Sequence, residues 1–90
     1  MLVDSNLNEI EKAFAKSKIP FDKVHIDIYE KYGDGFSFLL FMNGFYRTIV
    51  FNEECESVGK GDFVTKEEAR KHLQSLGFNF AREVYFKRNN

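Results

Sequence analysis

The dipeptide Asn43-Gly44 divides the most apolar segment of the chain, which reads FSFLLFMNGFYRTIVF over positions 36–51. A two-residue type I′ turn requires positive φ at both central positions, and Asn followed by Gly is a sequence that adopts it readily. The residues on either side are mostly aromatic and aliphatic, as in buried strands. The dipeptide therefore predicts a hairpin in which strands 36–42 and 45–51 pair antiparallel.

The register of this hairpin sorts its side chains onto two faces. If Met42 lies opposite Phe45, alternate residues of both strands share a face. The first face, which we expect to be the core, then carries Phe36, Phe38, Leu40, Met42, Phe45, Arg47, Ile49 and Phe51. The second face carries Ser37, Leu39, Phe41, Tyr46, Thr48 and Val50. Its centre is also apolar, so a helix, a second copy of the chain or another molecule is needed to cover it.

An alternating segment at 24–32 predicts a further strand before the hairpin. If Gly33-Asp34-Gly35 is a three-residue loop, the apolar residues of this strand join the core face, and they are Val24, Ile26 and Ile28. The residues between them then extend the second face, and they are His25, Asp27, Tyr29 and Lys31. Both turns thus give one consistent assignment of faces.

Capping signals predict two helices. The good N-cap residues at 4–6 precede an apolar stripe at helical spacing, and Pro20 should end this helix by Lys18. The stripe consists of Leu7, Ile10, Ala13 and Phe14. A second helix should begin after Thr65, which forms a capping box with Glu68, and should end before Gly77.

The remaining segments complete the predicted fold. Residues 52–64 are acidic and then broken by glycines, which predicts a long surface loop with a short extended piece at its end. Alternation over 78–87 predicts a fourth strand. The order α-β-β-β-α-β indicates one compact α+β domain over residues 1–90, with a mainly antiparallel four-stranded sheet packed against two helices. Two helices on the core face would leave the second face near solvent, whereas one helix per face would bury both.

Composition argues against several classes of function. The net charge is −1, so the chain has no global basic field to draw it onto nucleic acid or anionic lipid. Cys55 is the only cysteine, which precludes an intrachain disulfide and favours a reducing, cytoplasmic setting. Neither a signal-peptide pattern nor an apolar run of about 20 residues is present, so we expect no membrane association.

Catalytic motifs are also missing from the sequence. The Gly-rich segment 59–62 lacks the helix-opening Ser or Thr of a phosphate-binding loop. His25 and Asp27 are spaced to share a metal or a proton, but no third partner is evident, and His72 lies one helical turn from Glu68. We therefore predict no enzyme activity, no cofactor and no metal site, with a small metal-dependent or His-based enzyme as the weakest alternative.

The second face has the composition of a protein interface, with an aromatic centre and a polar rim. We predict a non-catalytic protein-binding module that uses Tyr29, Leu39, Phe41, Tyr46, Thr48 and Asp27. Acidic residues would steer it towards a basic partner, and they are Glu53, Glu54 and Glu56. A short chain rich in Lys, Asn and Phe resembles small phage or mobile-element proteins, which implies an inhibitor that masks a functional surface of a host or defence protein.

Two other uses of the same face stay open. A homodimer could form through this face or through an exposed sheet edge. A single-stranded nucleic acid could stack its bases on Tyr29, Phe41 and Tyr46, although no RRM-type motif accompanies these rings and Asp27 would lie among them.

Overall fold

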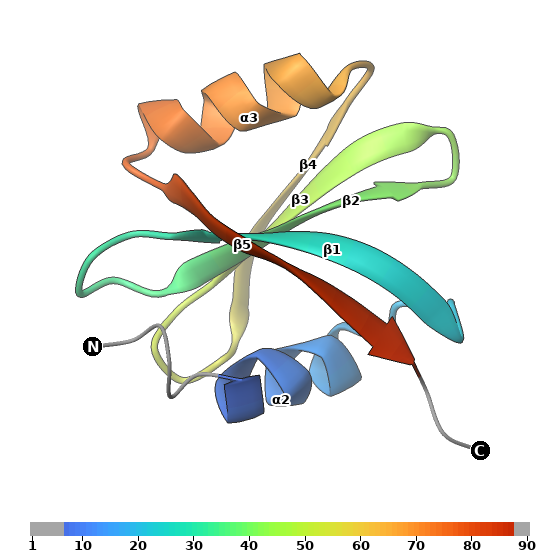
Figure 1. The fold of residues 1–90 in the computed structure, drawn as a ribbon. Coiled ribbons are helices and arrows are strands. Elements are labelled where there is room, and N and C mark those ends of the chain that lie inside the picture. Colours follow the sequence, from blue (N-terminus) through green and yellow to red (C-terminus); the bar gives the residue numbers. More distant parts are fainter. Residues whose placement is uncertain (1–6, 88–90) are drawn as a thin grey trace.

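The computed structural model describes residues 7–87, which form a five-stranded antiparallel sheet between two helices (Figure 1). The elements in chain order are α2 (Leu7–Ser17), β1 (Lys23–Glu30), β2 (Phe36–Met42), β3 (Phe45–Phe51), β4 (Ser57–Phe63), α3 (Lys66–Ser75) and β5 (Asn79–Lys87). The strand order across the sheet is β4-β3-β2-β1-β5. The predicted α+β class and both helices are confirmed, but the sheet has five strands instead of four. The predicted first N-cap, at 4–6, lies outside the described residues.

The hairpin that the sequence predicts is present with the predicted register. Asn43 and Gly44 have φ of 56° and 87°, and Met42 pairs with Phe45 across the turn. On the other side of β2, Ile28 of β1 pairs with Phe38. The assignment of side chains in β1, β2 and β3 to two faces is therefore confirmed. The expected burial of Phe45 is not, because it lies beside the hairpin turn and is 46% exposed.

The connection after β3 differs from the predicted long loop. Asn52 closes a short turn, because its Oδ1 accepts hydrogen bonds from the backbone N–H groups of Glu54 and Glu56 at 2.9 and 3.0 Å. Cys55 adopts positive φ (62°) within this turn, and β4 then pairs with β3 as an edge strand. The two glycines and two charged residues of β4 give it little strand propensity, so its pairing with β3 determines its conformation.

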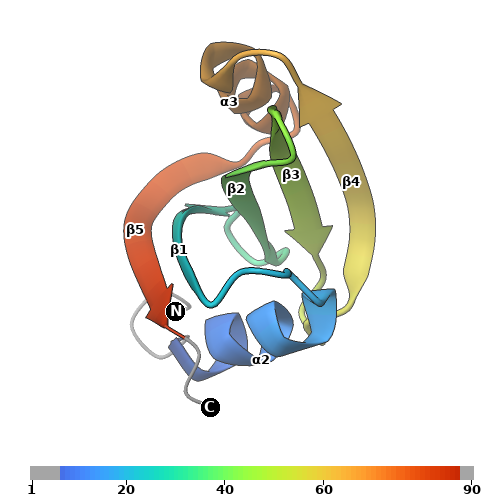
Figure 2. The same cartoon turned by 90° about the vertical axis from the view of Figure 1, so that its right-hand side faces the viewer.

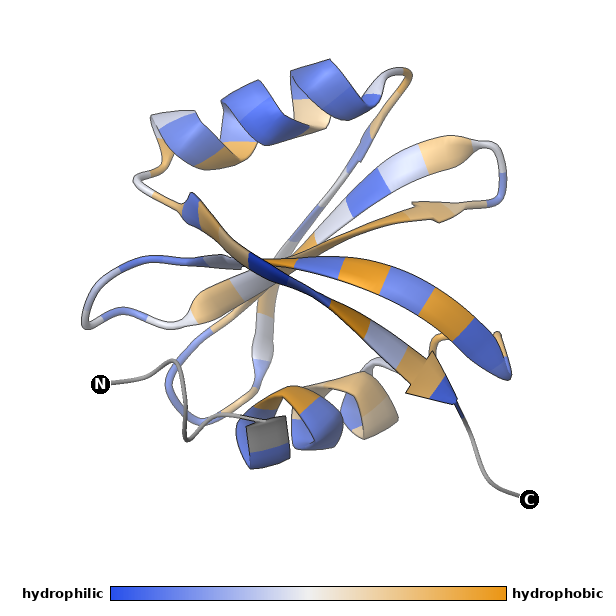
Figure 3. Cartoon of the chain, in the orientation of Figure 1, coloured by the Kyte–Doolittle hydropathy of each residue, from blue (hydrophilic) through white to orange (hydrophobic). Residues whose placement is uncertain are grey.

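The first core lies between the sheet and α2. Its centre is formed by aromatic and branched side chains from four strands and the helix, and the ring of Phe14 stacks on that of Phe86 at 4.3 Å. The strand residues of this core are Ile26, Ile28, Phe36, Phe38, Leu40, Met42, Ile49, Phe51 and Phe86. Along β1, hydrophobic and hydrophilic residues alternate as the strand runs over this core (Figure 3).

The second core lies on the opposite face, beneath α3. Ala69 and Leu73 of the helix pack with residues of the sheet and of the strand that follows, which are Tyr29, Leu39 and Phe78. Thr65 caps the helix in the predicted capping box with Glu68, and Gly77 follows it with φ of 93°. Figure 2 shows α2 and α3 on opposite sides of the curved sheet, with β4 and β5 at its edges.

A β-bulge in β5 connects the two cores. Ile28 pairs with Arg82, whereas the next residue, Tyr29, pairs with Phe80, so Ala81 is an extra residue on β5. Simple alternation would place Phe80 and Phe86 on the same face. The bulge instead moves Phe80 to the α3 side, where its ring meets that of Tyr29 at 5.7 Å.

Candidate functional site

Three of the predicted contact residues are buried on the second face. Tyr29, Leu39 and Thr48 have exposed fractions of 1%, 2% and 1%. They are buried because α3 covers the centre of the second face, which is the arrangement with one helix on each side. These three side chains therefore support the fold and do not form an accessible surface.

Phe41, Tyr46 and Asp27 lie around the margin of this covered region. Phe41 is 56% exposed, and its ring meets the half-buried ring of Tyr46 edge-on at 5.0 Å. The carboxylate of Asp27 is mostly buried and lies 3.0 Å from Nζ of Lys66. This hydrogen bond to Asp27 raises the pKa of the Lys66 ammonium, although partial burial opposes the shift. Asp27 therefore helps to hold α3 on the sheet.

The predicted acidic residues lie far along the sheet from Phe41. Glu53, Glu54 and Glu56 are exposed in the turn that follows β3, whereas Phe41 pairs with Tyr46 near the start of that strand. The acidic turn is next to α2 instead, since the Cys55 thiol donates to the carbonyl of Glu9 at 3.5 Å. The acidic residues and the exposed aromatic rings therefore do not form one continuous site.

The strand registers align aromatic rings across one end of the α3 face. Phe63, Tyr46 and Phe41 are successive cross-strand neighbours on β4, β3 and β2. On the other two strands, His25 pairs with Tyr85, and their rings are 4.5 Å apart. These rings come from all five strands and lie at the end of the sheet where β1 begins and β2 ends.

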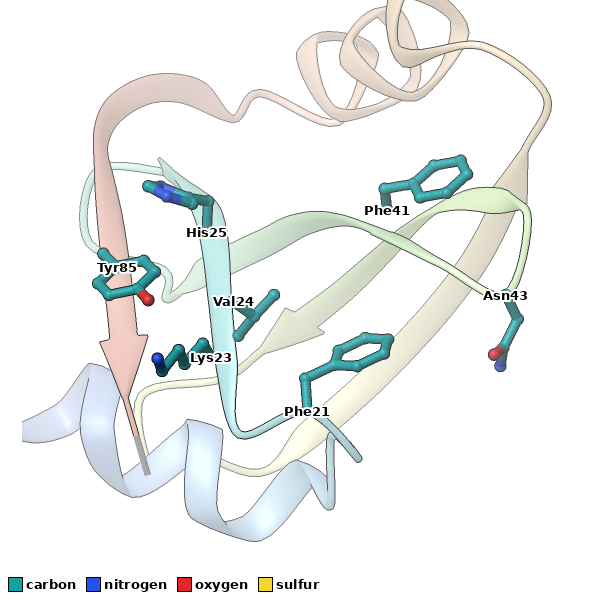
Figure 4. A pocket seen from close by; sticks show the side chains of 7 residues that line it. All are labelled: Phe21, Lys23, Val24, His25, Phe41, Asn43 and Tyr85. Atoms are coloured by element: carbon teal, nitrogen blue, oxygen red, sulfur yellow. The ribbon is translucent and has the colours of Figure 1, made fainter. Parts of the chain in front are cut away.

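Strands β1 and β2 separate from each other between the two groups of rings. Pairing between β1 and β2 runs from Asp27–Leu39 to Glu30–Phe36, whereas the earlier part of β1 follows β5 and the later part of β2 follows β3. The divergence opens a cleft of about 500 Å³ at this end of the sheet. We call it the aromatic cleft, and it is lined by Phe21, Lys23, Val24, His25, Phe41, Asn43 and Tyr85 (Figure 4).

The walls of the aromatic cleft combine apolar rings with a polar rim. Phe21 and Phe41 lie on opposite sides of the opening, and Val24 points into it (Figure 4). Tyr85 is 50% exposed, beside His25, whose Nδ1 is 3.3 Å from a carboxylate oxygen of Glu83. Of the predicted contact residues, only Phe41 lines this cleft. The sequence predicts the turn at Asn43 but not its position in the cleft. It also gives no local signal for the pairing of β1 with β5, which brings Tyr85 to His25.

Two further grooves are more polar than the aromatic cleft. One lies between α3 and the β1–β5 edge, where Lys66 pairs with Asp27 and Arg70 pairs with Glu67 at 3.3 Å. The other is formed by β3 and β4 around the two-pronged contact of Arg47 with Asp62. The cations of both grooves are thus largely engaged by carboxylates of the chain itself.

The two histidines lie apart. His25 pairs with Glu83 on the sheet, while the ring of His72 lies 5.0 Å from that of Phe63 beneath α3. Within residues 7–87, no three side chains of His, Cys, Asp or Glu are grouped as metal ligands. In the same part of the chain, neither helix has the length and apolar character needed to cross a membrane.

No protein-family model, curated protein or solved structure matches this chain.

Proposed function

We propose that the protein is a non-catalytic protein-binding module and that the aromatic cleft is its contact site. The observation that carries the proposal is the exposure of Phe41 and Tyr85 on the two walls of one concave opening. Large rigid rings around a pocket with a polar rim have the anatomy of a binding hot spot. A partner side chain that fills the cleft would remove apolar surface from water on both walls at once.

The proposal moves the predicted interface along the second face. Phe41 stays at its centre, Tyr46 supports the Phe41 ring, and Tyr85 replaces the buried Tyr29 as the second exposed ring. The resemblance to small phage or mobile-element proteins extends the proposal to an inhibitor, which would act by covering a functional surface of its partner. A reducing cytoplasm is the proposed setting, because Cys55 is a buried free thiol.

Selection from a random peptide library tests this proposal. The immobilised protein should enrich a set of related peptides, and Phe41→Ser should lose them. Phe80→Ser is a matched control, because Phe80 is also 56% exposed on the α3 side but lines the polar groove. Circular dichroism would establish that both variants are folded. No enrichment by the wild type, or equal enrichment by Phe41→Ser, would refute the proposed function.

Single-stranded nucleic-acid binding is the second candidate, and one observation favours it. Lys23 and Lys87 are paired at the end of the strands that carry His25 and Tyr85, so cations lie beside rings that could stack on bases. Oligonucleotides of dT and dA decide between the two functions. Tight, salt-sensitive binding that Phe41→Ser abolishes would replace the protein partner with a nucleic acid.

A homodimer through the aromatic cleft is tested by sedimentation. A dimer that forms with rising protein concentration, and that Phe41→Ser dissociates, would mean that a second copy of the chain fills the cleft. We expect a monomer whose sedimentation is the same for Phe41→Ser and Phe80→Ser.

A further inference from the structure

The aromatic cleft is large enough to take a Leu- or Phe-sized side chain together with part of the backbone that carries it. Its volume is about 500 Å³, and its apolar walls come from Phe21, Val24, Phe41 and Tyr85. Because the cleft opens where β1 and β2 separate, its long direction is set by the two diverging strands. An extended peptide segment could run over this opening and insert one Leu- or Phe-sized side chain.

The charged residues at the cleft indicate which kind of peptide segment would bind best. Among residues 7–87, its lining includes Lys23 and His25 and no carboxylate. Lys23 is also directly opposite Lys87 in the antiparallel register, on the face that carries His25 and Tyr85. Like charges in direct cross-strand opposition destabilise a sheet, and an anionic group between them would relieve the repulsion. Both lysines are exposed and therefore accessible to a partner.

Asp22 is exposed in the connection just before Lys23, whereas the carboxylates nearest to the cleft within β1 and β5 already have partners in the chain. Glu83, two residues before Tyr85 on β5, lies against His25, and Asp27 on β1 is paired with Lys66. The positive region is therefore short and is confined to the end of the sheet. A partner with a few carboxylates beside its apolar anchor would complement it.

A nucleic acid fits this charge pattern less well. A single strand carries a phosphate at every nucleotide, and binders of single strands line the whole path with cations. Beyond His25, a strand crossing the α3 face would meet Glu83 and Asp27. These carboxylates are paired with His25 and Lys66, so this path does not offer the continuous line of available cations that a run of phosphates needs, whereas a peptide can place its acidic residues only where the lysines are.

We infer that the aromatic cleft takes an acidic peptide segment of a partner protein, with one large apolar side chain in the cleft and flanking carboxylates against Lys23 and Lys87. This inference rests on the proposed function and specifies the class of partner segment. The cleft supplies the anchor, and the two lysines supply the preference for negative charge.

Three fluorescein-labelled probe peptides test the preference by fluorescence anisotropy at low salt. They share a central Leu-Phe pair and differ only in its flanks: GSEELFEESG, GSSSLFSSSG and GSKKLFKKSG. Exposed ion pairs each contribute modestly, so we expect the acidic probe to bind roughly three- to tenfold more tightly than the neutral one. The basic probe should bind most weakly, and added salt should reduce the difference.

Charge reversal provides the decisive variant. Lys23→Glu combined with Lys87→Glu should invert the order, so that the basic probe binds best. The matched control is Lys12→Glu combined with Lys16→Glu, which makes the same change in net charge on exposed positions of α2. An unchanged order in the first variant, or the same inversion in the control, would overturn the inference. If the charge reversal impairs folding, Lys23→Ser with Lys87→Ser should abolish the preference between the acidic and neutral probes.

The two proposals can fail separately. If the random library yields peptides that depend on Phe41 but carry no excess of acidic residues, the protein-binding function stands and the acidic preference is refuted. If oligo-dT competes with the acidic probe and binds more tightly than it does, the anionic partner is a nucleic acid and the peptide inference is refuted.

Discussion

Leu73→Ala should strongly destabilise the protein, because Leu73 anchors α3 to the sheet. Its side chain is completely buried, among Tyr29, Leu39 and Phe78. Truncation of a fully buried leucine costs about 2–5 kcal/mol, as lost transfer free energy and a residual cavity. For a domain of this size, a loss of about 3 kcal/mol should lower the melting temperature by roughly 12–24 °C.

Urea unfolding followed by circular dichroism measures this loss. Leu76→Ala is the matched control, since Leu76 ends the same helix but is 43% exposed, and it should cost under about 1 kcal/mol. Leu73→Ala should also be coupled to Leu39→Val by at least about 0.5 kcal/mol, whereas Ile10→Val, in the other core, should be additive. Coupling to Ile10 and additivity with Leu39 would refute the arrangement with one helix on each face.

Three other substitutions test local features. Gly35→Ala should lower the free energy of unfolding, measured in urea, by more than about 1 kcal/mol. Gly35 has φ of 91°, and an added Cβ would clash with the carbonyl of Phe51. An unchanged free energy of unfolding would contradict this backbone geometry. Thr65→Ala should lower the free energy of unfolding by about 1 kcal/mol, since it removes the hydroxyl that accepts a hydrogen bond from the Glu68 N–H. Thr65→Ser keeps a hydroxyl and should retain most of the stability. The hydrogen bond from Arg47 lowers the pKa of Asp62, so its stabilising effect is present above the ordinary carboxyl pKa and is lost as the pH falls through the lowered pKa. Unfolding free energies of wild type and Asp62→Asn should therefore differ near neutral pH and converge in acid, and a constant difference down to the lowest pH would contradict this pairing.

The parts of the fold that local sequence determines were predictable. Asn43-Gly44 determines a turn type, the turn determines the register, and the register assigns every residue of β2 and β3 to a face. Thr65, Glu68 and Gly77 likewise mark both ends of α3 through hydrogen bonds within a few residues. In these segments, interactions between residues a few positions apart are sufficient to predict the structure.

Features that depend on distant pairing were not predictable in this way. The segment that forms β4 has the composition of a loop, and it becomes a strand because β3 offers it an unpaired edge. The bulge at Ala81 reverses the alternation of β5 without any residue that marks it. The choice between two helices on one face and one on each depended on packing, which the apolar stripes alone could not settle.

The candidate site was predicted only at Phe41. An apolar second face was visible in the sequence, but the part of it that stays exposed depends on where α3 lies. The aromatic cleft combines residues of β1, β2, β5, the α2–β1 connection and the β2–β3 turn, and it exists because β1 separates from β2 after a few pairs. Tyr85 and Lys23 become neighbours of Phe41 only through that tertiary geometry.

Amide chemical-shift mapping with the acidic probe GSEELFEESG tests the central claim most directly. A nitrogen-15-labelled sample should show its largest shifts at residues that line the aromatic cleft, namely 21, 23–25, 41, 43 and 85, and at Lys87. Phe41→Ser should remove these shifts, and Phe80→Ser should preserve them. Largest shifts in the groove formed by Asp27, Lys66 and Arg70, or shifts that Phe41→Ser leaves unchanged, would contradict the assignment of the binding site.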